Sequence, residues 1–371
     1  MSETPYYISL EDAINITHKY PLKTDVEQVS LDEAHGRILA SDLSSKVNDP
    51  PFDNSAMDGF AVRFEDTNTA PTTLSIIATS QAAASEDSIS ISSGEAVQIM
   101  TGAPLPKGAD AIIPIEACTI DGDLVTLNQP SKPNFIRRCG ENIKEGTIGL
   151  KEGSHLSPQS ISMCATMGYD QIPVVKKLKI GVISTGDELK SPGETLSFGE
   201  IYESNSYGLS GLVKALGHTP FRYPSVVDSM DNLRRQFDQA SSECDLFLTS
   251  GGVSMGEWDF VRKLMEEEGN IAFWRVRIRP GSPPLFGHWN ETPMFGLPGN
   301  PVSSHVVFRM LVTPYLRDSL RTSFPIDRIV HAKLLTDVRS TNDCLTLRRV
   351  TLLSTKEGFL AEQPKHQGSG N

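Results

Sequence analysis

The sequence predicts a multidomain protein of mixed α/β and β class, in which a doubly wound α/β domain is joined to smaller β domains. Three observations support this prediction. The chain has 371 residues, more than one compact core usually holds. Strand and helix patterns alternate over residues 177–326, as in doubly wound sheets. Short β-type runs separated by turn residues occupy residues 70–135, as in small barrels or sandwiches.

Composition excludes several classes of function. The formal net charge is −12, whereas a protein that binds nucleic acid non-specifically needs a basic face to neutralise phosphates. The five cysteines are scattered and include no C-x-x-C pair, so we expect reduced thiols in the cytoplasm and no zinc site. The sequence contains neither a signal-peptide pattern nor a run of 18 apolar residues, so no membrane span is expected.

The first predicted elements come before the α/β domain. Residues 9–20 (SLEDAINITHKY) are predicted to form a helix with Ser9 as its N-cap. A second helix is predicted to start at Ser30, where Glu33 completes a capping box. Four β-type runs follow between residues 74 and 130: LSIIATS, AVQIM, AIIPIEACTI and LVTLNQP. They are separated by Gly, Pro and Asp, which are typical of turns.

The doubly wound domain is predicted from residue 177 onward. KIGVIST and CDLFLTS have the continuous apolar character of buried strands. Helix patterns occupy SNSYGLSGLVKALGH, capped near Ser204 or Asn205, DSMDNLRRQFDQASSE and WDFVRKLMEEEG. The segment PMFGLPGNPVSSHVVFRMLVTPYL is predicted to form a strand, a turn and a long helix. β-type runs return after residue 327, so a further β domain is expected there.

Three loops at the ends of predicted strands are candidates for a ligand site: STGDEL (184–189), TSGGVSMGEWD (249–259) and GLPGNPVS (296–303). In open α/β sheets, ligands bind beyond the carboxyl ends of the strands. Glycines let the backbone approach a ligand closely, and helix N-termini present free N–H groups to anions. Asn300 suits an N-cap and Pro301 the first helical position. The loops therefore predict a phosphate or oxyanion site.

Acidic residues flank the same loops: Asp187, Glu188, Asp228, Glu257 and Asp259. Carboxylates beside an anion site indicate a divalent cation between them, because otherwise they would repel the ligand. Oxygen-only donors favour Mg²⁺ over zinc. A basic complement is expected in WRVRIRPGSPP, where Arg275, Arg277 and Arg279 alternate and would share one face of a strand.

Each of these features also has a purely structural interpretation. A glycine-rich turn after a strand is often only a turn. Asp187, Asp228 and Asp259 could be N-caps or solvated loop acids, and the arginines could mark an exposed strand edge. Three further residues with reactive side chains are expected to be structural: Cys139, His218 and His305. The co-occurrence of all three loops at strand ends favours a ligand site.

The sequence contains neither G-x-x-x-x-G-K-[ST] nor G-x-G-x-x-G, so an ordinary NTPase or Rossmann dehydrogenase is not expected. It resembles instead the MoeA family, the molybdenum-inserting enzymes of molybdenum cofactor synthesis, also seen as the E domain of gephyrin. The matching stretches are PPFDNSAMDGFAVR (50–63), IMTGAPLPKGADAIIPIE (99–116), RRCGEN (137–142), STGDEL (184–189), TSGGVSMGEWDFV (249–261) and GLPGNPVSS (296–304). They spread over most of the chain in family order.

This resemblance implies an activity and a set of partners. Family members bind adenylylated molybdopterin and molybdate, insert the metal at the dithiolene and release AMP in a Mg²⁺-dependent step. They form elongated homodimers, with the catalytic cleft between the α/β domain of one subunit and the small β domain of the other. The molybdopterin adenylyltransferase and apo-molybdoenzymes are the implied transient partners. Neither nucleic acid nor membrane is implied.

The family architecture implies four domains in this sequence. An elongated helical and β linking domain is expected from residues 1–50 with 140–176, and a small β-barrel domain from residues 51–139. A doubly wound molybdopterin-binding domain, similar to MoaB and MogA, is expected from residues 177–326. Residues 327–371 are expected to form part of a C-terminal β domain.

The family's functional residues map onto positions of this sequence. The implied catalytic residues are Asp58, Thr101, Asp187, Glu188, Asp228 and Asp259, and the implied metal ligands are Asp187, Glu188, Asp228 and Asp259. The implied cofactor-binding residues are Arg137, Ser184, Gly186, Ser250, Gly251, Gly252, Gly256, Arg275, Arg279, Pro298, Gly299, Asn300, Pro301 and Ser303. By this resemblance, Asp58 belongs to the cleft wall that the small domain offers to the partner subunit.

The sequence is compatible with two functions. Asn142 stands where R-x-G-E-D has an aspartate, and Ser282 stands where K-P-G-K-P has a lysine, so each position lacks one charge of the family pattern. The intact acids and the PGNP loop favour a molybdopterin molybdenumtransferase. The alternative is a non-catalytic protein of the same fold that binds the pterin nucleotide or acts as a scaffold, by analogy with gephyrin.

Overall fold

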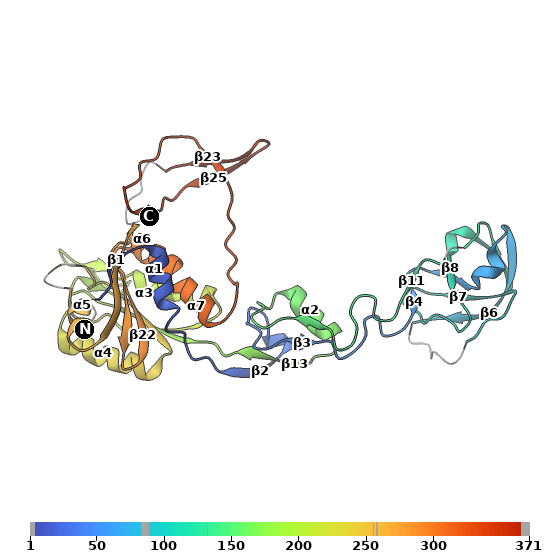
Figure 1. Cartoon of the computed structure of the whole chain (residues 1–371), viewed down its shortest axis with the longest axis horizontal. Coiled ribbons are helices and arrows are strands. Elements are labelled where there is room, and N and C mark those ends of the chain that lie inside the picture. The colour runs from blue at the N-terminus through green and yellow to red at the C-terminus, as the bar shows by residue number, and fades with distance from the viewer. Residues whose placement is uncertain (1–3, 83–88, 132, 255, 257–258, 365–371) are drawn as a thin grey trace.

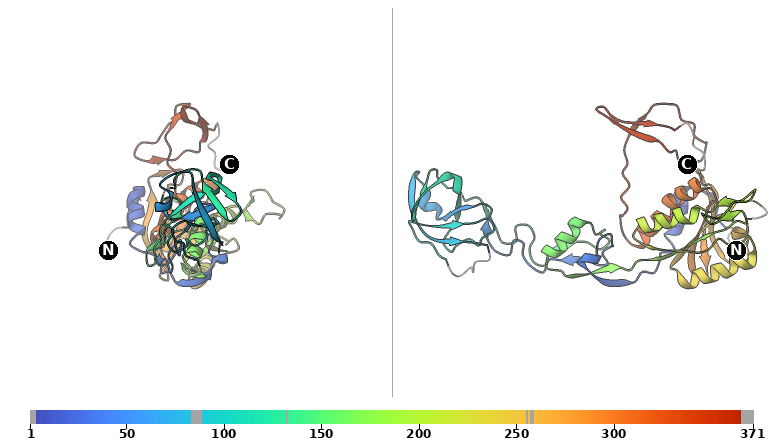
Figure 2. Two further views of the ribbon diagram at one scale, coloured as in Figure 1. Left: turned by 90° about the vertical axis from the view of Figure 1, so that its right-hand side faces the viewer. Right: turned by 180° about the vertical axis from the view of Figure 1, so that it is seen from behind.

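The computed structural model describes residues 4–82, 89–131, 133–254, 256 and 259–364. The molecule is elongated, with an α/β domain at one end, a β domain at the other and a narrow linking region between them (Figure 1). The last strands of the chain lie beside the α/β domain (Figure 2). None of the helices in these residues is long and apolar enough to cross a membrane.

A seven-stranded sheet forms the centre of the α/β domain, in the order β1-β19-β21-β22-β18-β14-β17. The strands are β1 (Tyr6–Ile8), β14 (Lys179–Ser184), β17 (Thr219–Arg222), β18 (Leu246–Ser250), β19 (Asn270–Val276), β21 (Leu285–Trp289) and β22 (Thr292–Leu297). Strands β22, β18, β14 and β17 are parallel, whereas β21 is antiparallel to both of its neighbours. The predicted doubly wound sheet is confirmed, with an antiparallel strand toward one edge.

Helices cover both faces of this sheet. They are α1 (Leu10–Thr17), α3 (Asn205–Ala215), α4 (Met230–Glu243), α5 (Phe260–Glu267), α6 (Pro301–Val307) and α7 (Thr313–Ser319), with a π-helical turn at Phe308–Val312 between α6 and α7. One apolar core includes residues of α1, α3, α6 and α7, and another includes residues of α4 and α5. Val182 of β14 belongs to the first core and Ile183 to the second, as the alternation of side chains along a strand requires.

The N-terminal segment belongs to the α/β domain. β1 pairs in parallel with β19, and Ser9 caps α1 by accepting a hydrogen bond from the backbone N–H of Asp12 at 3.0 Å. Ala13 of α1 is fully buried in the core shared with α3 and α7. Residues 6–17 therefore depart from the grouping of residues 1–50 in the linking domain, because the apolar face of α1 packs against the sheet.

The linking region is a narrow β-ribbon with one helix. Its elements are β2 (Val26–Ser30) paired with β13 (Gln171–Val175), β3 (Leu43–Ser44) paired with β12 (Ile148–Leu150), and α2 (Pro158–Thr166). The helix predicted from Ser30 is wrong, since only one 3-10 turn, Leu31–Glu33, forms there. Ser30 still pairs with Gln171 in the ribbon, and Gly36 turns the chain away at a φ of 75°.

The distal β domain has a six-stranded sheet in the order β8-β5-β7-β6-β10-β9. The strands are β5 (Gly59–Val62), β6 (Thr72–Ser80), β7 (Glu95–Ile99), β8 (Ala111–Pro114), β9 (Cys118–Asp121) and β10 (Leu124–Leu127). The four predicted runs form β6 to β10, the third run dividing into β8 and β9. A short ladder between β4 (Asn54–Ser55) and β11 (Ile136–Arg137) lies where the domain joins the linking region.

The last described segment contacts the α/β domain. It contains β23 (Ala332–Leu334), β25 (Thr351–Thr355) and β26 (Gly358–Glu362) in one sheet, and β24 (Leu345–Thr346), which pairs with β20 (Ile278–Arg279).

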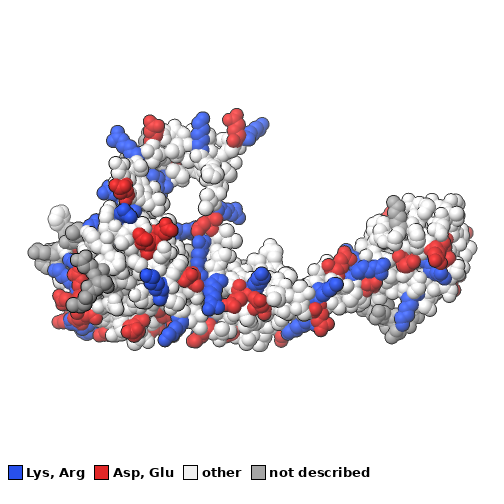
Figure 3. Space-filling view, viewed as in Figure 1, with Lys and Arg blue, Asp and Glu red and all other residues white. Residues whose placement is uncertain are grey.

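Acidic and basic side chains are interspersed over the face of the molecule seen in Figure 3. The described residues on that face therefore offer no continuous basic surface for a phosphate backbone.

Candidate ligand site

A cavity of about 600 Å³ lies at the carboxyl ends of β14, β18 and β22. It is lined by residues of all three glycine-rich loops that the sequence singled out. Ligand pockets for small molecules and cofactors have volumes of roughly 300–1,000 Å³. The cavity therefore has room for a ligand of nucleotide size.

Two glycines are required where the first two loops approach each other. Gly186 has a φ of 149°, and a Cβ there would lie 2.6 Å from the carboxylate of Glu188. Gly251 has a φ of 102°, and a Cβ there would lie 2.9 Å from the carbonyl oxygen of Thr185. A side chain at either position would be strained by the positive φ, and at Gly251 it would also meet the backbone of the first loop.

Three of the predicted carboxylates line this cavity, and a fourth, that of Asp187, lies beside them. The backbone N–H of Asp228 donates to Asp187 Oδ1 at 2.9 Å, and Glu188, Asp228 and Asp259 line the cavity. Asp228 Oδ1 is buried without a hydrogen-bond partner. Burial, followed by the negative charges of Asp187, Glu188 and Asp259, raises the pKa of Asp228 to about 6. In such a cluster, burial and the neighbouring negative charges disfavour the ionised form of a carboxyl group.

The helix-capping interpretation does not explain these acids. Ser229, not Asp228, caps α4 by accepting the backbone N–H of Asn232. Asp259 precedes α5 but makes no side-chain cap bond to it, and it accepts instead the backbone N–H of Gly256.

The oxygen donors of these acids are of the kind that hard divalent cations prefer. A buried carboxylate oxygen without a partner, among neighbours of like charge, is stabilised when a hard cation binds. In the part of the chain that the structure describes, no group of three His, Cys, Asp or Glu side chains could hold a metal ion as it stands. The acids therefore lie near one another but are not arranged as a complete set of metal ligands. Glu257 lies outside the described residues.

The third loop opens onto α6 as the sequence predicted. Asn300 caps the helix by accepting the backbone N–H of Ser303 at 3.1 Å, and Pro301 occupies the first turn. Pro298 and Gly299 line the cavity beside Asn300. The PGNP backbone is thus held by a capped helix at the edge of the cavity.

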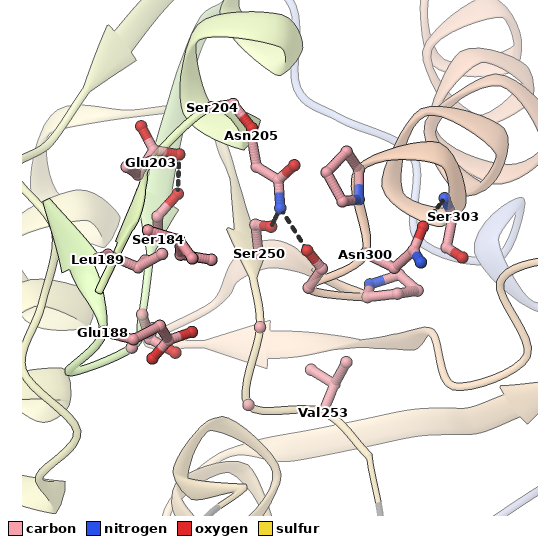
Figure 4. Close-up of a pocket in the computed structure, with 18 of the residues that line it drawn as sticks. Ser184, Glu188, Leu189, Glu203, Ser204, Asn205, Ser250, Val253, Asn300 and Ser303 are labelled. Carbon is pink, nitrogen blue, oxygen red and sulfur yellow. Dashed lines mark hydrogen bonds between the residues drawn. The ribbon is translucent and has the colours of Figure 1, made fainter. Parts of the chain in front are cut away.

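Glu203 and Asn205 line the cavity but were not among the site residues predicted from the sequence. Glu203 is 4% exposed and accepts a hydrogen bond from Ser184 Oγ at 2.9 Å. Asn205 Nδ2 donates to Ser250 Oγ and to the carbonyl oxygen of Gly299, each at 2.7 Å (Figure 4). The sequence predicted only that a helix starts near Ser204 or Asn205. That prediction does not indicate which loops the side chains of Glu203 and Asn205 contact.

The prediction that three arginines share one strand face is wrong. Arg275 has a φ of 67°, and β19 ends at Val276, so the alternation of an extended strand is broken. The guanidinium of Arg275 donates to the Tyr6 hydroxyl at 2.7 Å and lies over the rings of Tyr6 and Tyr7. Arg275 is therefore held at the N-terminal edge of the sheet.

Arg279 lines a second cavity, of about 350 Å³, between α6 and the C-terminal segment. Arg348 and Arg349 of that segment line the same cavity, as do Val302 and Val306 of α6. The first turn of α6 thus contributes to both cavities, of which the smaller is lined by these arginines and the larger by the acids Glu188, Asp228 and Asp259.

Three predicted site residues lie in the distal β domain: Asp58, Thr101 and Arg137. The Asp58 carboxylate accepts the backbone N–H of Thr101 at 2.7 Å and its hydroxyl at 2.8 Å, and these bonds lower the pKa of Asp58. Arg137 is exposed in β11. The linking region separates the distal β domain from the α/β domain (Figure 2), so a single chain does not bring the two groups together.

The surroundings of the three residues expected to be structural agree with that expectation. The backbone N–H of Cys139 donates to Asp53 at 2.8 Å. Burial lowers the pKa of His218 to about 4, so the imidazole is neutral at physiological pH. His305 packs against α3, where a Cβ on Gly208 would lie 2.5 Å from its Nε2.

The fold and the cavity define a class of protein: a multidomain α/β protein with a nucleotide-sized site where capped loops and acids meet. Comparison with known families makes this specific. Residues 8–168 match the family model described as MoeA N-terminal region (domain I and II). Residues 181–318 match the model described as probable molybdopterin binding domain.

Full-length relatives agree with these matches. The molybdopterin molybdenumtransferase of Haemophilus influenzae is 41% identical over 80% of this chain and 73% of its own length. The Bacillus subtilis protein of that name is 31% identical over 96% of this chain and 85% of its own length. The crystal structure of the molybdopterin biosynthesis MoeA protein from Pyrococcus horikoshii OT3 has a TM-score of 0.84 and 30% identity, covering 98% of this chain and 92% of that chain. The chain belongs to the MoeA family.

Proposed function

We propose that this protein is a molybdopterin molybdenumtransferase, which inserts molybdate into adenylylated molybdopterin with Mg²⁺-dependent release of AMP. The observation that carries the proposal is the convergence of three glycine-rich loops and the carboxylates of Glu188, Asp228 and Asp259 on one cavity of about 600 Å³, with Asp187 beside Asp228. The names of the curated relatives support the same activity.

The chemistry of AMP release fits these residue types. Cleaving a phosphoanhydride requires neutralisation of charge on the phosphates and accurate positioning. Asp187, Glu188, Asp228 and Asp259 would hold the Mg²⁺, which supplies that neutralisation. The backbone N–H groups of the PGNP turn, held by the Asn300 cap, would bind phosphate oxygens. Glu188, which is exposed in the cavity, would orient the attacking water.

Molybdate is a compact dianion and needs cationic donors. Arg279, Arg348 and Arg349 line the smaller cavity on the other side of the first turn of α6. We place the oxyanion near this arginine group. Arg275 is not part of this proposal, because its guanidinium is engaged with Tyr6.

The proposed enzyme is a homodimer in which the distal domain of a second copy supplies Asp58, Thr101 and Arg137. Support comes from Asp58, which is exposed and whose pKa is lowered by its hydrogen bonds to Thr101, in a domain that the linking region separates from the α/β domain (Figure 2). The residue grouping into a linking domain, a distal β domain, an α/β domain and a C-terminal β segment is part of the same proposal. The five cysteines are all free, which supports a cytoplasmic setting, where an adenylyltransferase would supply the substrate and apo-molybdoenzymes would receive the product.

The test is a reconstitution with Glu188→Gln. Purified protein is mixed with adenylylated molybdopterin, molybdate and Mg²⁺, and AMP release is followed together with activation of an apo-molybdoenzyme. We expect the wild-type protein to release AMP only when molybdate and Mg²⁺ are both present. Glu188→Gln should retain the fold and lose AMP release, because the amide removes a metal-organising charge. The matched control is Glu267→Gln, at an exposed position of α5.

AMP release by Glu188→Gln at the wild-type rate would remove Glu188 from its proposed role. Binding of the pterin nucleotide by the wild-type protein without AMP release would instead support the scaffold alternative.

A further inference from the structure

The segment from Glu203 to Asn205 contacts all three loops that line the large cavity. Glu203 Oε1 accepts hydrogen bonds from Ser184 Oγ at 2.9 Å, at the start of the STGDEL loop, and from the backbone N–H of Ser206 at 2.7 Å. Because Glu203 is 4% exposed, these bonds are shielded from water. A buried carboxylate with several donors is held firmly in one orientation.

Asn205 connects the other two loops. Its Nδ2 donates to Ser250 Oγ, in the TSGG loop, and to the carbonyl oxygen of Gly299, in the PGNP loop. A carbonyl oxygen only accepts hydrogen bonds, so the atom that faces Gly299 must be the amide nitrogen. Both N–H groups of that nitrogen are then used, and the orientation of the amide is fixed (Figure 4).

Backbone hydrogen bonds also connect the loops, but they lie at the ends of the strands. The N–H of Thr185 donates to the carbonyl oxygen of Ser250 at 3.1 Å, and the N–H of Gly251 donates to that of Leu297 at 3.0 Å. Asn205 differs because it reaches Gly299, within the PGNP turn itself. Position 205 is also the first residue of α3, and its side chain makes no cap bond to that helix, because Nδ2 bonds the two loops and Oδ1 has no hydrogen-bond partner.

We infer that Glu203 and Asn205 are positioning residues, which hold the three loops in one arrangement so that the acids of the first loop face the groups bound by the other two. The inference rests on the proposed function and extends it by naming the side chains that set this geometry. Misplacement of reacting groups by about 1 Å can cost about 100-fold in rate. Loss of the Asn205 contacts should therefore reduce turnover more than binding.

The first experiment uses Asn205→Asp in the full-length protein. The carboxylate has nearly the same shape as the amide but lacks both donors, and it would face the Gly299 carbonyl oxygen with negative charge. We expect kcat for AMP release to fall by about 100-fold, while KM for adenylylated molybdopterin changes by less than about threefold. Asn68→Asp, at an exposed position of the distal domain, is the matched control and should leave both parameters unchanged.

A second readout does not depend on activity. Hydrogen exchange at the backbone amides of Gly251 and Gly299 should be faster in Asn205→Asp than in wild type, because the two loops lose their shared side chain. Glu203→Gln should give the same changes to a smaller extent, since glutamine retains an acceptor for the Ser206 N–H. This second variant serves if Asn205→Asp does not fold.

The outcomes separate this inference from the proposed function. A wild-type protein that releases no AMP contradicts the proposed function, and hydrogen exchange alone then decides the positioning role. Unchanged kcat, or a raised KM with unchanged kcat, overturns the positioning role in an active enzyme. Unchanged exchange at Gly251 and Gly299 overturns it in either case.

Discussion

Asp228 illustrates how one side chain carries an energetic cost at the cavity. Its pKa is raised to about 6 by burial and by the neighbouring acids, whereas an aspartate in an unfolded chain titrates near ~3.9. Between these two values the native state binds a proton that the unfolded state has released. The contribution of Asp228 to the free energy of unfolding therefore falls as the pH rises from about 4 to about 6, and stays low above that.

Asp228→Asn should stabilise the protein at about pH 7, because it removes a charge that its surroundings disfavour. A shift of about two pKa units corresponds to about 3 kcal/mol, and screening at this partly exposed position reduces the expected gain to about 1 kcal/mol. Thermal unfolding at about pH 7 and about pH 4.5 measures it, and the gain should shrink at the lower pH. A destabilised variant at about pH 7 would contradict this account of the cluster.

Single residues differ in how far the sequence reveals them. The acids and glycines of the three loops were predictable, because their types and their positions after strands already indicate a ligand site. The contacts of Glu203 and Asn205 were not, because they depend on where α3 starts relative to two distant loops. The prediction that the arginines share one strand face was wrong for a local reason. A single residue with left-handed backbone, Arg275, is enough to interrupt the alternation of side chains along a strand.

Helix α6 shows both the strength and the limit of prediction for an element. Its start was predictable from Asn300 and Pro301, which suit the cap and the first helical position. The π-helical turn at Phe308–Val312 was not, although Pro314 follows it closely. A proline cannot donate to the carbonyl four residues earlier and its ring clashes there, and a helix that continues through it must widen locally.

Asn300→Ala should cost about 1 kcal/mol of stability through loss of the cap. It should also weaken binding of AMP, because the PGNP turn is no longer held at the helix start. Calorimetric titration with AMP and thermal unfolding measure the two effects. Ser157→Ala is the matched control, since Ser157 caps α2 in the linking region. It should lower stability without changing AMP affinity, and equal affinity in both variants would refute the role of the cap in binding.

The junction between the linking region and the distal domain gives Asn142 a structural role. Its Nδ2 donates to Asp49 Oδ2 at 2.9 Å. Nearby in the sequence, Arg138 Nη1 and Asp53 Oδ2 form an ion pair at 2.6 Å. An amide at position 142 therefore complements the carboxylate of Asp49, which an aspartate at position 142 would repel.

Asn142→Asp should destabilise the protein by up to about 1 kcal/mol, since two carboxylates would then face each other at an accessible site. The effect should be larger at low ionic strength, because salt screens exposed charges. Unfolding temperatures of the variant and the wild type at low and high salt provide the measurement. A variant as stable as wild type at low salt would show that Asp49 finds another partner.

Across the whole molecule, the linking region is fixed to the α/β domain at a second place besides its ribbon. Thr322 Oγ donates to the carbonyl oxygen of Gly153 at 2.7 Å, and the rings of His155 and Phe324 stack with centroids 3.6 Å apart. A Cβ on Gly153 would lie 2.0 Å from the carbonyl oxygen of Arg321. The sequence predicted the doubly wound sheet and the strands of the distal domain, but not these contacts, because they join segments far apart in the chain.

The proposed composite site can be tested by mixing two inactive variants, Asp58→Asn and Glu188→Gln. If each site takes Asp58 from one copy and Glu188 from the other, random exchange of subunits makes about a quarter of the sites intact. AMP release should therefore recover to about a quarter of the wild-type rate after the subunits are exchanged. No recovery, despite exchange shown by labelled subunits, would mean that the two residues do not act in one site.

The distal domain is continuous in sequence, and its two ends lie side by side. The chain enters at Asn54 and leaves at Arg137, which pair directly in the ladder of β4 and β11. Its apolar clusters are built from its own strands and loops. The segment could therefore be deleted and replaced by a short turn, or exchanged for the same segment of a homologue. Neither change would alter the path of the rest of the chain. Exchange of this segment alone would let evolution alter one side of the proposed composite site while the other side stays the same.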